Sequence, residues 1–441
     1  MPRNTVFHSQ AHEPFRTKEF LELRDDRVTG PLSFLNPTRA SFRHKPAKEK
    51  TLGTAKDLQN GLDADQTSEY KSGKLDDEQS ASSVEFNWRS RDNRKGRHAL
   101  VVNPSVDPSP PYLVPKPTSV PREVARNIAL MWTSYPYWDV SYLVATTFTW
   151  GSIVWVINAF FVFLPLVQPK TKFKNEILVG GGVSAFIGAT IFEIGSVLLM
   201  VEAMNENRSG CFGWALTRVL SGSEDGHRFR VRPDKDRCTH HHTAKGNFVR
   251  KGSIGRPLDS IRSQNSSPNS EEKPMETNST ADSWVWFPSW FELKTHYLRE
   301  LGFLASFSQF CGATIFWISG FTALPGINNK LSQGLLDGVY WVPQIVGGSG
   351  FIISGFLYML ETQSKWYLPA WGVLGWHIGF WNLVGAFGFT LSGALGPAYG
   401  NSGAQYEAAL ATFWGSWAFL IGSTIQWYES LDKHPVETQK I

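Results

Sequence analysis

The chain has little of what disulfide-rich, metal-dependent or catalytic folds usually require. Its 441 residues include only three cysteines, Cys211, Cys238 and Cys311. This odd and sparse set does not suggest a disulfide framework, and the sequence has no C-x-x-C pair typical of zinc or redox sites. It also contains no phosphate-binding glycine loop, nucleophile elbow or H-E-x-x-H motif. We therefore predict a protein that is not an enzyme and that binds no cofactor or metal.

Two further absences concern targeting and partners. The first ten residues, MPRNTVFHSQ, lack an apolar stretch, so we expect no cleavable signal peptide and insertion started by an internal helix. The net charge of +4 is too small to imply nucleic-acid binding. Nucleic acid is therefore not an expected partner.

Aromatic residues are abundant but unevenly placed. The chain has 18 Trp, of which only Trp88 precedes residue 130. The mean hydropathy is slightly negative, at -0.22. This average joins a polar N-terminal part to a very apolar C-terminal part, a division that excludes a conventional soluble enzyme.

Six long windows of the C-terminal part are nearly free of charge. A helix needs about 20 apolar residues to span a bilayer core, and a charge inside the core costs about 3 kcal/mol on insertion scales. Buried core helices of a large soluble domain fit six windows of this length and purity less well. We predict an all-α membrane protein with six transmembrane helices, at 142–167, 177–201, 301–325, 338–360, 367–394 and 408–428.

The even-numbered windows align without gaps. Each reads G-x3-F-x-I-[GS]-[SG]-x-[LI]-x3-E, so that glycine, phenylalanine and a small residue share one helix face. The first, third and fifth windows agree more loosely: 151–160 matches 312–321, and 384–387 matches 157–160 at the shift of 227 residues that relates the second and sixth windows. We predict three parallel tandem helical hairpins. The aligned positions are Gly188, Phe192 and Gly195; Gly347, Phe351 and Ser354; and Gly415, Phe419 and Gly422.

These small residues have a direct physical role. Lipid gives helices no hydrophobic reason to associate, so close backbone approach at small residues drives packing. We favour this packing interpretation over a ligand-binding one. The motif ends in Glu202, Glu361 and Glu429, which are either ordinary interfacial carboxylates or a ring of three acids at the mouth of a pore or cavity.

The F-x-I-G-S core followed by an acid resembles the YrhK-like membrane module, a two-helix unit without established chemistry. The helical part, roughly 130–430, also resembles uncharacterised fungal multi-pass integral membrane proteins. The resemblance implies architecture and transfers no catalytic residue. It departs at Ser354-Gly355, where the motif has Gly-Ser.

The resulting organisation has six parts. Residues 1–129 are a polar region expected to be largely disordered, and 205–283 a similar basic, serine-rich cytosolic loop. Residues 130–204 hold an interfacial aromatic segment and the first hairpin. Residues 284–361 hold an interfacial helix and the second hairpin, 362–429 the third, and 430–441 the tail.

Lys and Arg are more frequent near one set of span ends, which places both termini in the cytosol of an unspecified membrane. The sequons Asn207, Asn265 and Asn278 in the long loop would favour the opposite orientation. Residues 227–256 carry nine Lys/Arg against two acids and suggest contact with anionic lipid headgroups. The lipid bilayer and a second copy of the chain in a homo-oligomer complete the expected partners.

Intramembrane polar groups are functional candidates by default. Glu193 lies nine residues from Glu202, about 13 Å along the helix, and His377 is expected about 15 Å deep from the same face. We predict a Glu193–His377 pair, with Asn158 and Asn382 as alternative partners. The leading hypothesis is a small-solute or proton-coupled transporter or channel. The alternative is a membrane scaffold or sensor whose disordered tails recruit partners.

Overall fold

The computed structural model describes residues 21–23, 28–44, 84–97, 99–102, 117–206, 208–213 and 284–438. Six of its helices are long and apolar enough to cross a membrane. The prediction of a helical membrane protein with six transmembrane helices is therefore confirmed. These helices are α4 (Val140–Val167), α5 (Gly182–Met204), α9 (Leu301–Thr322), α11 (Val342–Thr362), α12 (Leu374–Leu395) and α13 (Ser402–Leu431).

Shorter elements flank the long helices. A π-helical turn, Glu176–Gly181, leads into α5, while α10 (Gln333–Leu336) and a second π turn, Asp337–Trp341, lead into α11. Outside the bundle lie α3 (Pro121–Thr133) and α8 (Trp290–Thr295). The remaining turns are 3-10 helices at Pro169–Thr171, Ser209–Cys211, Tyr297–Arg299, Asn328–Lys330 and Gly396–Ala398.

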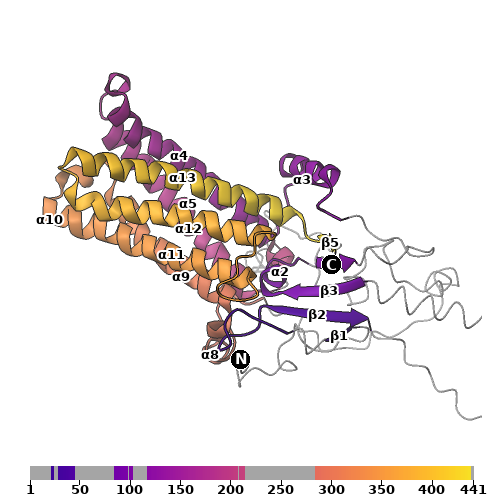
Figure 1. The fold of residues 1–441 in the computed structure, drawn as a ribbon. Coiled ribbons are helices and arrows are strands. Elements are labelled where there is room, and N and C mark those ends of the chain that lie inside the picture. Colours follow the sequence, from indigo (N-terminus) through magenta and orange to yellow (C-terminus); the bar gives the residue numbers. More distant parts are fainter. Residues whose placement is uncertain are drawn as a thin grey trace, which may run out of the picture.

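The six long helices form a closed ring. Each packs against the long helix before it and the one after it, and α13 returns to pack against α4. Figure 1 shows them side by side as one bundle, with the strands at one end. The six helices therefore surround a central axis.

Two triangles of aromatic rings lie along this axis. Trp155, Phe316 and Phe389 come from α4, α9 and α12, and their ring centroids lie 4.8–5.8 Å apart. Each of these rings also contacts a ring of the second triangle, which comes from α5, α11 and α13. The second triangle consists of Phe192, Phe351 and Phe419, with centroids 5.5–6.4 Å apart.

Glycines let each triangle approach the neighbouring helix. A Cβ added to Gly188 would meet the Trp155 ring at 2.8 Å, and one added to Gly151 would meet the Phe192 ring at 2.6 Å. The other two hairpins repeat this reciprocal contact: Gly347 with Phe316 and Gly312 with Phe351, then Gly415 with Phe389 and Gly385 with Phe419. The predicted glycine stripe therefore lies at the interface within each hairpin.

The predicted alignment of the fifth window is wrong by seven residues. Gly385 takes the place of Gly151, a shift of 234 residues, whereas Gly188 and Gly415 are 227 residues apart. The two shifts differ because the connection inside the third hairpin is seven residues shorter than the one inside the first. One gap-free shift therefore cannot relate both helices of these hairpins.

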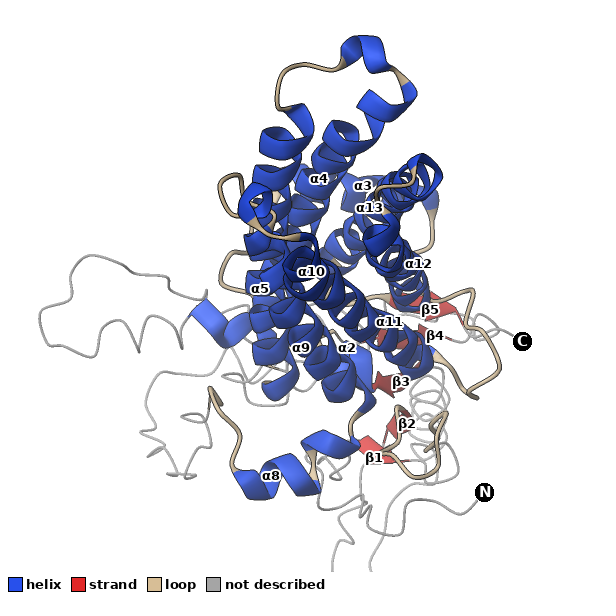
Figure 2. Ribbon diagram, turned by 90° about the vertical axis from the view of Figure 1, so that its left-hand side faces the viewer, coloured by secondary structure: helices blue, strands red, loops and turns tan. Residues whose placement is uncertain are grey.

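A five-stranded sheet lies at one end of the ring, as Figure 2 shows in red. Its order is β1 (Leu21–Leu23), β2 (Arg39–His44), β3 (Val84–Arg89), β4 (Ala99–Val102) and β5 (Val436–Thr438). Neighbours pair antiparallel except β4 and β5, which pair parallel. The expectation of a largely disordered 1–129 is wrong where the structure describes this region, because four of its segments form strands.

Candidate functional site

The site is built on the connection between β3 and β4. This connection contains α2 (Ser90–Arg94), a single helical turn that ends at Lys95 and Gly96. Gly96 has a φ of 62°, a left-handed conformation that favours glycine and stops the helix. A Cβ there would also meet the Ser209 hydroxyl at 2.8 Å. We call residues 90–97 the finger.

The finger presents its basic side chains to the ring. Arg91, Arg94 and Lys95 follow the i, i+3, i+4 spacing that places residues on one face of a helix. Arg97 follows after the turn. All four side chains are at least nine-tenths buried, although charged residues rarely bury without partners.

Arg94 pairs with Glu361 at the end of α11. Its two terminal nitrogens donate to the two carboxylate oxygens over 2.6 and 2.9 Å, a bidentate arrangement. The Ser90 hydroxyl donates a third hydrogen bond to the same carboxylate over 2.9 Å. Burial alone lowers the pKa of Arg94, but the adjacent Glu361 outweighs it and leaves the pKa raised.

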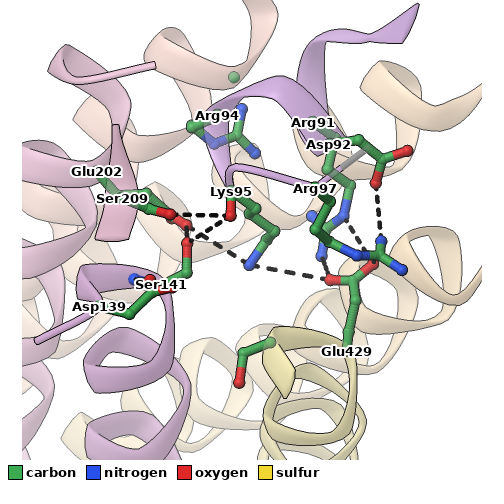
Figure 3. Close-up of polar contacts among 12 residues, drawn as sticks. Arg91, Asp92, Arg94, Lys95, Arg97, Asp139, Ser141, Glu202, Ser209 and Glu429 are labelled. Carbon is green, nitrogen blue, oxygen red and sulfur yellow. Dashed lines mark hydrogen bonds and ion pairs between the residues drawn. The ribbon is translucent and has the colours of Figure 1, made fainter. Parts of the chain in front are cut away.

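Glu429, at the end of α13, receives two arginines. Arg91 donates to it over 2.7 Å and Arg97 over 3.1 Å, and Arg97 also donates to Asp92 over 2.8 Å. Figure 3 shows these side chains converging on the end of α13. Burial lowers the pKa values of both arginines, yet the facing carboxylates leave them raised.

Lys95 lies between two glutamates. Its Nζ is 3.8 Å from a Glu202 oxygen and 3.9 Å from a Glu429 oxygen, and makes no hydrogen bond. Burial lowers the pKa of Lys95 to about 8, against the opposing effect of Glu202. The Ser141 hydroxyl donates directly to Glu202.

Each hairpin thus supplies one glutamate and one small residue. Ser141, Gly302 and Gly375 begin α4, α9 and α12, at the same shifts that relate Gly151, Gly312 and Gly385. A Cβ on Gly302 would meet an Arg94 nitrogen at 1.6 Å, and one on Gly375 would meet Arg91 at 2.4 Å. Small residues therefore leave the space that the guanidinium groups occupy.

We call the region where the finger enters the ring the mouth, and its charges balance. Four cations of the finger, Arg91, Arg94, Lys95 and Arg97, face four anions, Asp92, Glu202, Glu361 and Glu429. Because all three glutamates contact the finger, helices α5, α11 and α13 end on the same side of the ring, as parallel hairpins require. We call this side the glutamate end.

Two cavities lie on either side of the aromatic triangles. A small one, about 30 Å³, is lined by finger residues together with Ser354, Asn382 and Gln426. A larger one, about 300 Å³, has Trp155, Phe316 and Phe389 at its base and extends toward the end opposite the glutamates. Along the axis, the finger is followed by the small cavity, the two aromatic layers and the large cavity.

The predicted Glu193–His377 pair is not formed. Glu193 accepts a hydrogen bond from Thr314 of α9 over 3.0 Å, and His377 contacts the Trp371 carbonyl oxygen over 2.8 Å. The predicted depth of His377 is wrong because α12 begins only at Leu374, which places His377 in its first turn. Helices α5 and α12 also lie across the ring from each other.

The alternative partners occupy separate places. Asn158 lines the large cavity and donates to the Gly181 carbonyl over 2.6 Å. Asn382 lines the small cavity and donates to the Ile378 carbonyl over 2.8 Å. They lie on opposite sides of the aromatic triangles, and neither contacts Glu193 or His377.

The finger is the part of the site that sequence reasoning missed. Two signals were present: the alternation in VEFNWR (84–89), typical of a strand, and the R-x-x-R-K spacing followed by glycine. The sequons, the basic segment 227–256 and Cys238 lie outside the described residues.

No family model matches this chain, and no match was found among the curated proteins or the solved structures. The resemblance to the YrhK-like module stays a prediction.

Proposed function

We propose that this polytopic membrane protein is a channel or transporter whose solute pathway follows the axis of the six-helix ring and is closed by the finger. The observation that carries this proposal is the burial of four basic side chains in the mouth of the ring, each paired with an acid. The sequence left two interpretations of Glu202, Glu361 and Glu429: ordinary interfacial carboxylates, or a ring of three acids at the mouth of a pore or cavity. Their convergence on the finger favours the second interpretation.

The axis supports this proposal because it is not filled uniformly. A purely structural bundle would pack its centre with apolar side chains throughout, since interiors are close-packed. Here two cavities interrupt the packing, and the aromatic layers between them are only two residues thick along the axis. We place the glutamate end in the cytosol, following the Lys/Arg distribution.

The scaffold hypothesis has one observation in its favour. The sheet forms a platform outside the ring. It is fixed to the ring by Asn36, which donates to Glu300 at the start of α9 over 2.6 Å, and by Arg39 of β2, which donates to the Thr362 carbonyl oxygen at the end of α11. A platform of this kind offers a surface to which partner proteins can bind. A scaffold, however, needs neither cavities along the axis nor buried charges at its mouth.

A steric displacement of the finger tests the proposal without changing any charge. Gly302→Ala and Gly375→Ala would push Arg94 and Arg91 out of the mouth, whereas Gly338→Ala meets open space and is the matched control. In proteoliposomes, we expect the double variant to release trapped urea or guanidinium at least tenfold faster than the control variant. Release no faster than from protein-free liposomes, by a double variant that remains folded, would refute a pathway and leave the scaffold.

A further inference from the structure

We propose that the pathway recognises small organic cations bearing a guanidinium or primary ammonium group. This inference rests on the proposed function and names its substrate class. Two separate regions of the axis carry it, the glutamate end and the large cavity, and they select for the same chemistry.

The first region already holds such groups. The glutamate end binds three guanidinium groups and an ammonium group as side chains of the finger, in contacts that suit these shapes. Glu361 receives Arg94 in the bidentate geometry that distinguishes guanidinium from spherical cations. When the finger leaves, three carboxylates remain at the entrance of the ring, and their negative charge attracts cations that fit the space of the finger side chains.

The second region offers acceptors and aromatic faces. The amide of Asn158 is fixed by donating to the Gly181 carbonyl, and that of Gln344 by donating to the Phe389 carbonyl over 3.2 Å. Backbone carbonyls only accept, so the amide nitrogens must face them. Among the described residues, no donor reaches either side-chain oxygen, which leaves two acceptors on the cavity lining.

The walls of the large cavity favour a cation over an anion. None of the described residues that line it carries a positive charge, and Trp155, Tyr340, Trp341 and Tyr399 are among them. Aromatic faces attract ammonium and guanidinium groups through their quadrupoles, more strongly when water is excluded. The volume of about 300 Å³ suits a compact solute, since it equals roughly ten waters.

Guanidinium and urea provide a matched pair of probes, because they share a planar shape and differ in charge. In proteoliposomes containing the Gly302→Ala/Gly375→Ala variant, we expect guanidinium influx to exceed urea influx at least tenfold. Gln344→Leu added to this variant should reduce guanidinium influx at least threefold. Gln333→Leu, at an exposed position, is its control and should leave influx unchanged.

The outcomes separate the inference from the proposed function. If urea enters as fast as guanidinium, or faster, the pathway exists but the cation inference is overturned. If neither enters faster than into protein-free liposomes, the proposed function itself fails. Equal guanidinium influx with and without Gln344→Leu would remove the large cavity from the recognition site and overturn the inference as stated.

Discussion

Replacing Arg94 with glutamine should destabilise the protein far more than replacing an exposed arginine. The substitution leaves Glu361, whose side chain is 0% exposed, with only the Ser90 hydroxyl as a charge-stabilising donor from the finger. It also changes a mouth of four cations and four anions into one with a net negative charge. Removing one partner of a buried pair typically costs about 3–5 kcal/mol.

The exposed pair Arg126–Glu123 is the internal control. Its atoms are 3.0 Å apart, but the arginine side chain is 57% exposed, so Arg126→Gln should cost about 0–1 kcal/mol. We expect Arg94→Gln to lower the midpoint of thermal unfolding by about 10 °C, followed by tryptophan fluorescence in detergent micelles. Adding Glu361→Gln should restore most of the loss, because the buried charge is then gone.

Two results would refute this reasoning. Equal midpoints for Arg94→Gln and Arg126→Gln would mean that the finger does not hold the buried position described here. A double variant no more stable than Arg94→Gln would mean that the loss comes from packing of the arginine stem rather than from the unpaired carboxylate.

Two further predictions concern helix packing and pH. Gly350→Val should destabilise the ring by about 1–3 kcal/mol relative to Gly338→Val. A Cβ at position 350 would meet the Gly312 Cα at 2.7 Å and force α9 and α11 apart, whereas one at position 338 meets open space. The midpoints of thermal unfolding compare the two variants, and equal midpoints would contradict the close approach of α9 and α11. The lowered pKa of Lys95, about 8 against 10.5 in the unfolded chain, means that the unfolded state binds more protons between these values. The free energy of unfolding should therefore rise by about 3 kcal/mol from pH 8 to pH 10.5, and unfolding of Lys95→Met should lack this rise.

The membrane-embedded part was readable from the sequence because lipid imposes a simple rule on each helix. A span must be apolar over its length and small where it meets a neighbour, so Gly188 and Gly347 appear in register without knowledge of their partners. The glutamates could be placed at one end by the same register.

The partners of those glutamates could not be read in this way. Arg94 and Glu361 are separated by 267 residues, and neither residue alone indicates the other. The strands that carry the finger are short and embedded in a long polar stretch, whose average composition concealed them. His377 was misplaced because the absence of charge around 367–373 marks apolar sequence, not helix.

The parallel pairing of β5 with β4 has a consequence for biosynthesis. Strand β5 follows α13, so it emerges from the ribosome after all six spanning helices, whereas the finger emerges before the first of them. Glu429, the acid that receives two arginines, is also translated late. Translation therefore adds 332 residues between Arg97 and its partner Glu429. The finger can complete its contacts only after the last helix has been made, so the mouth of the ring closes late in biosynthesis.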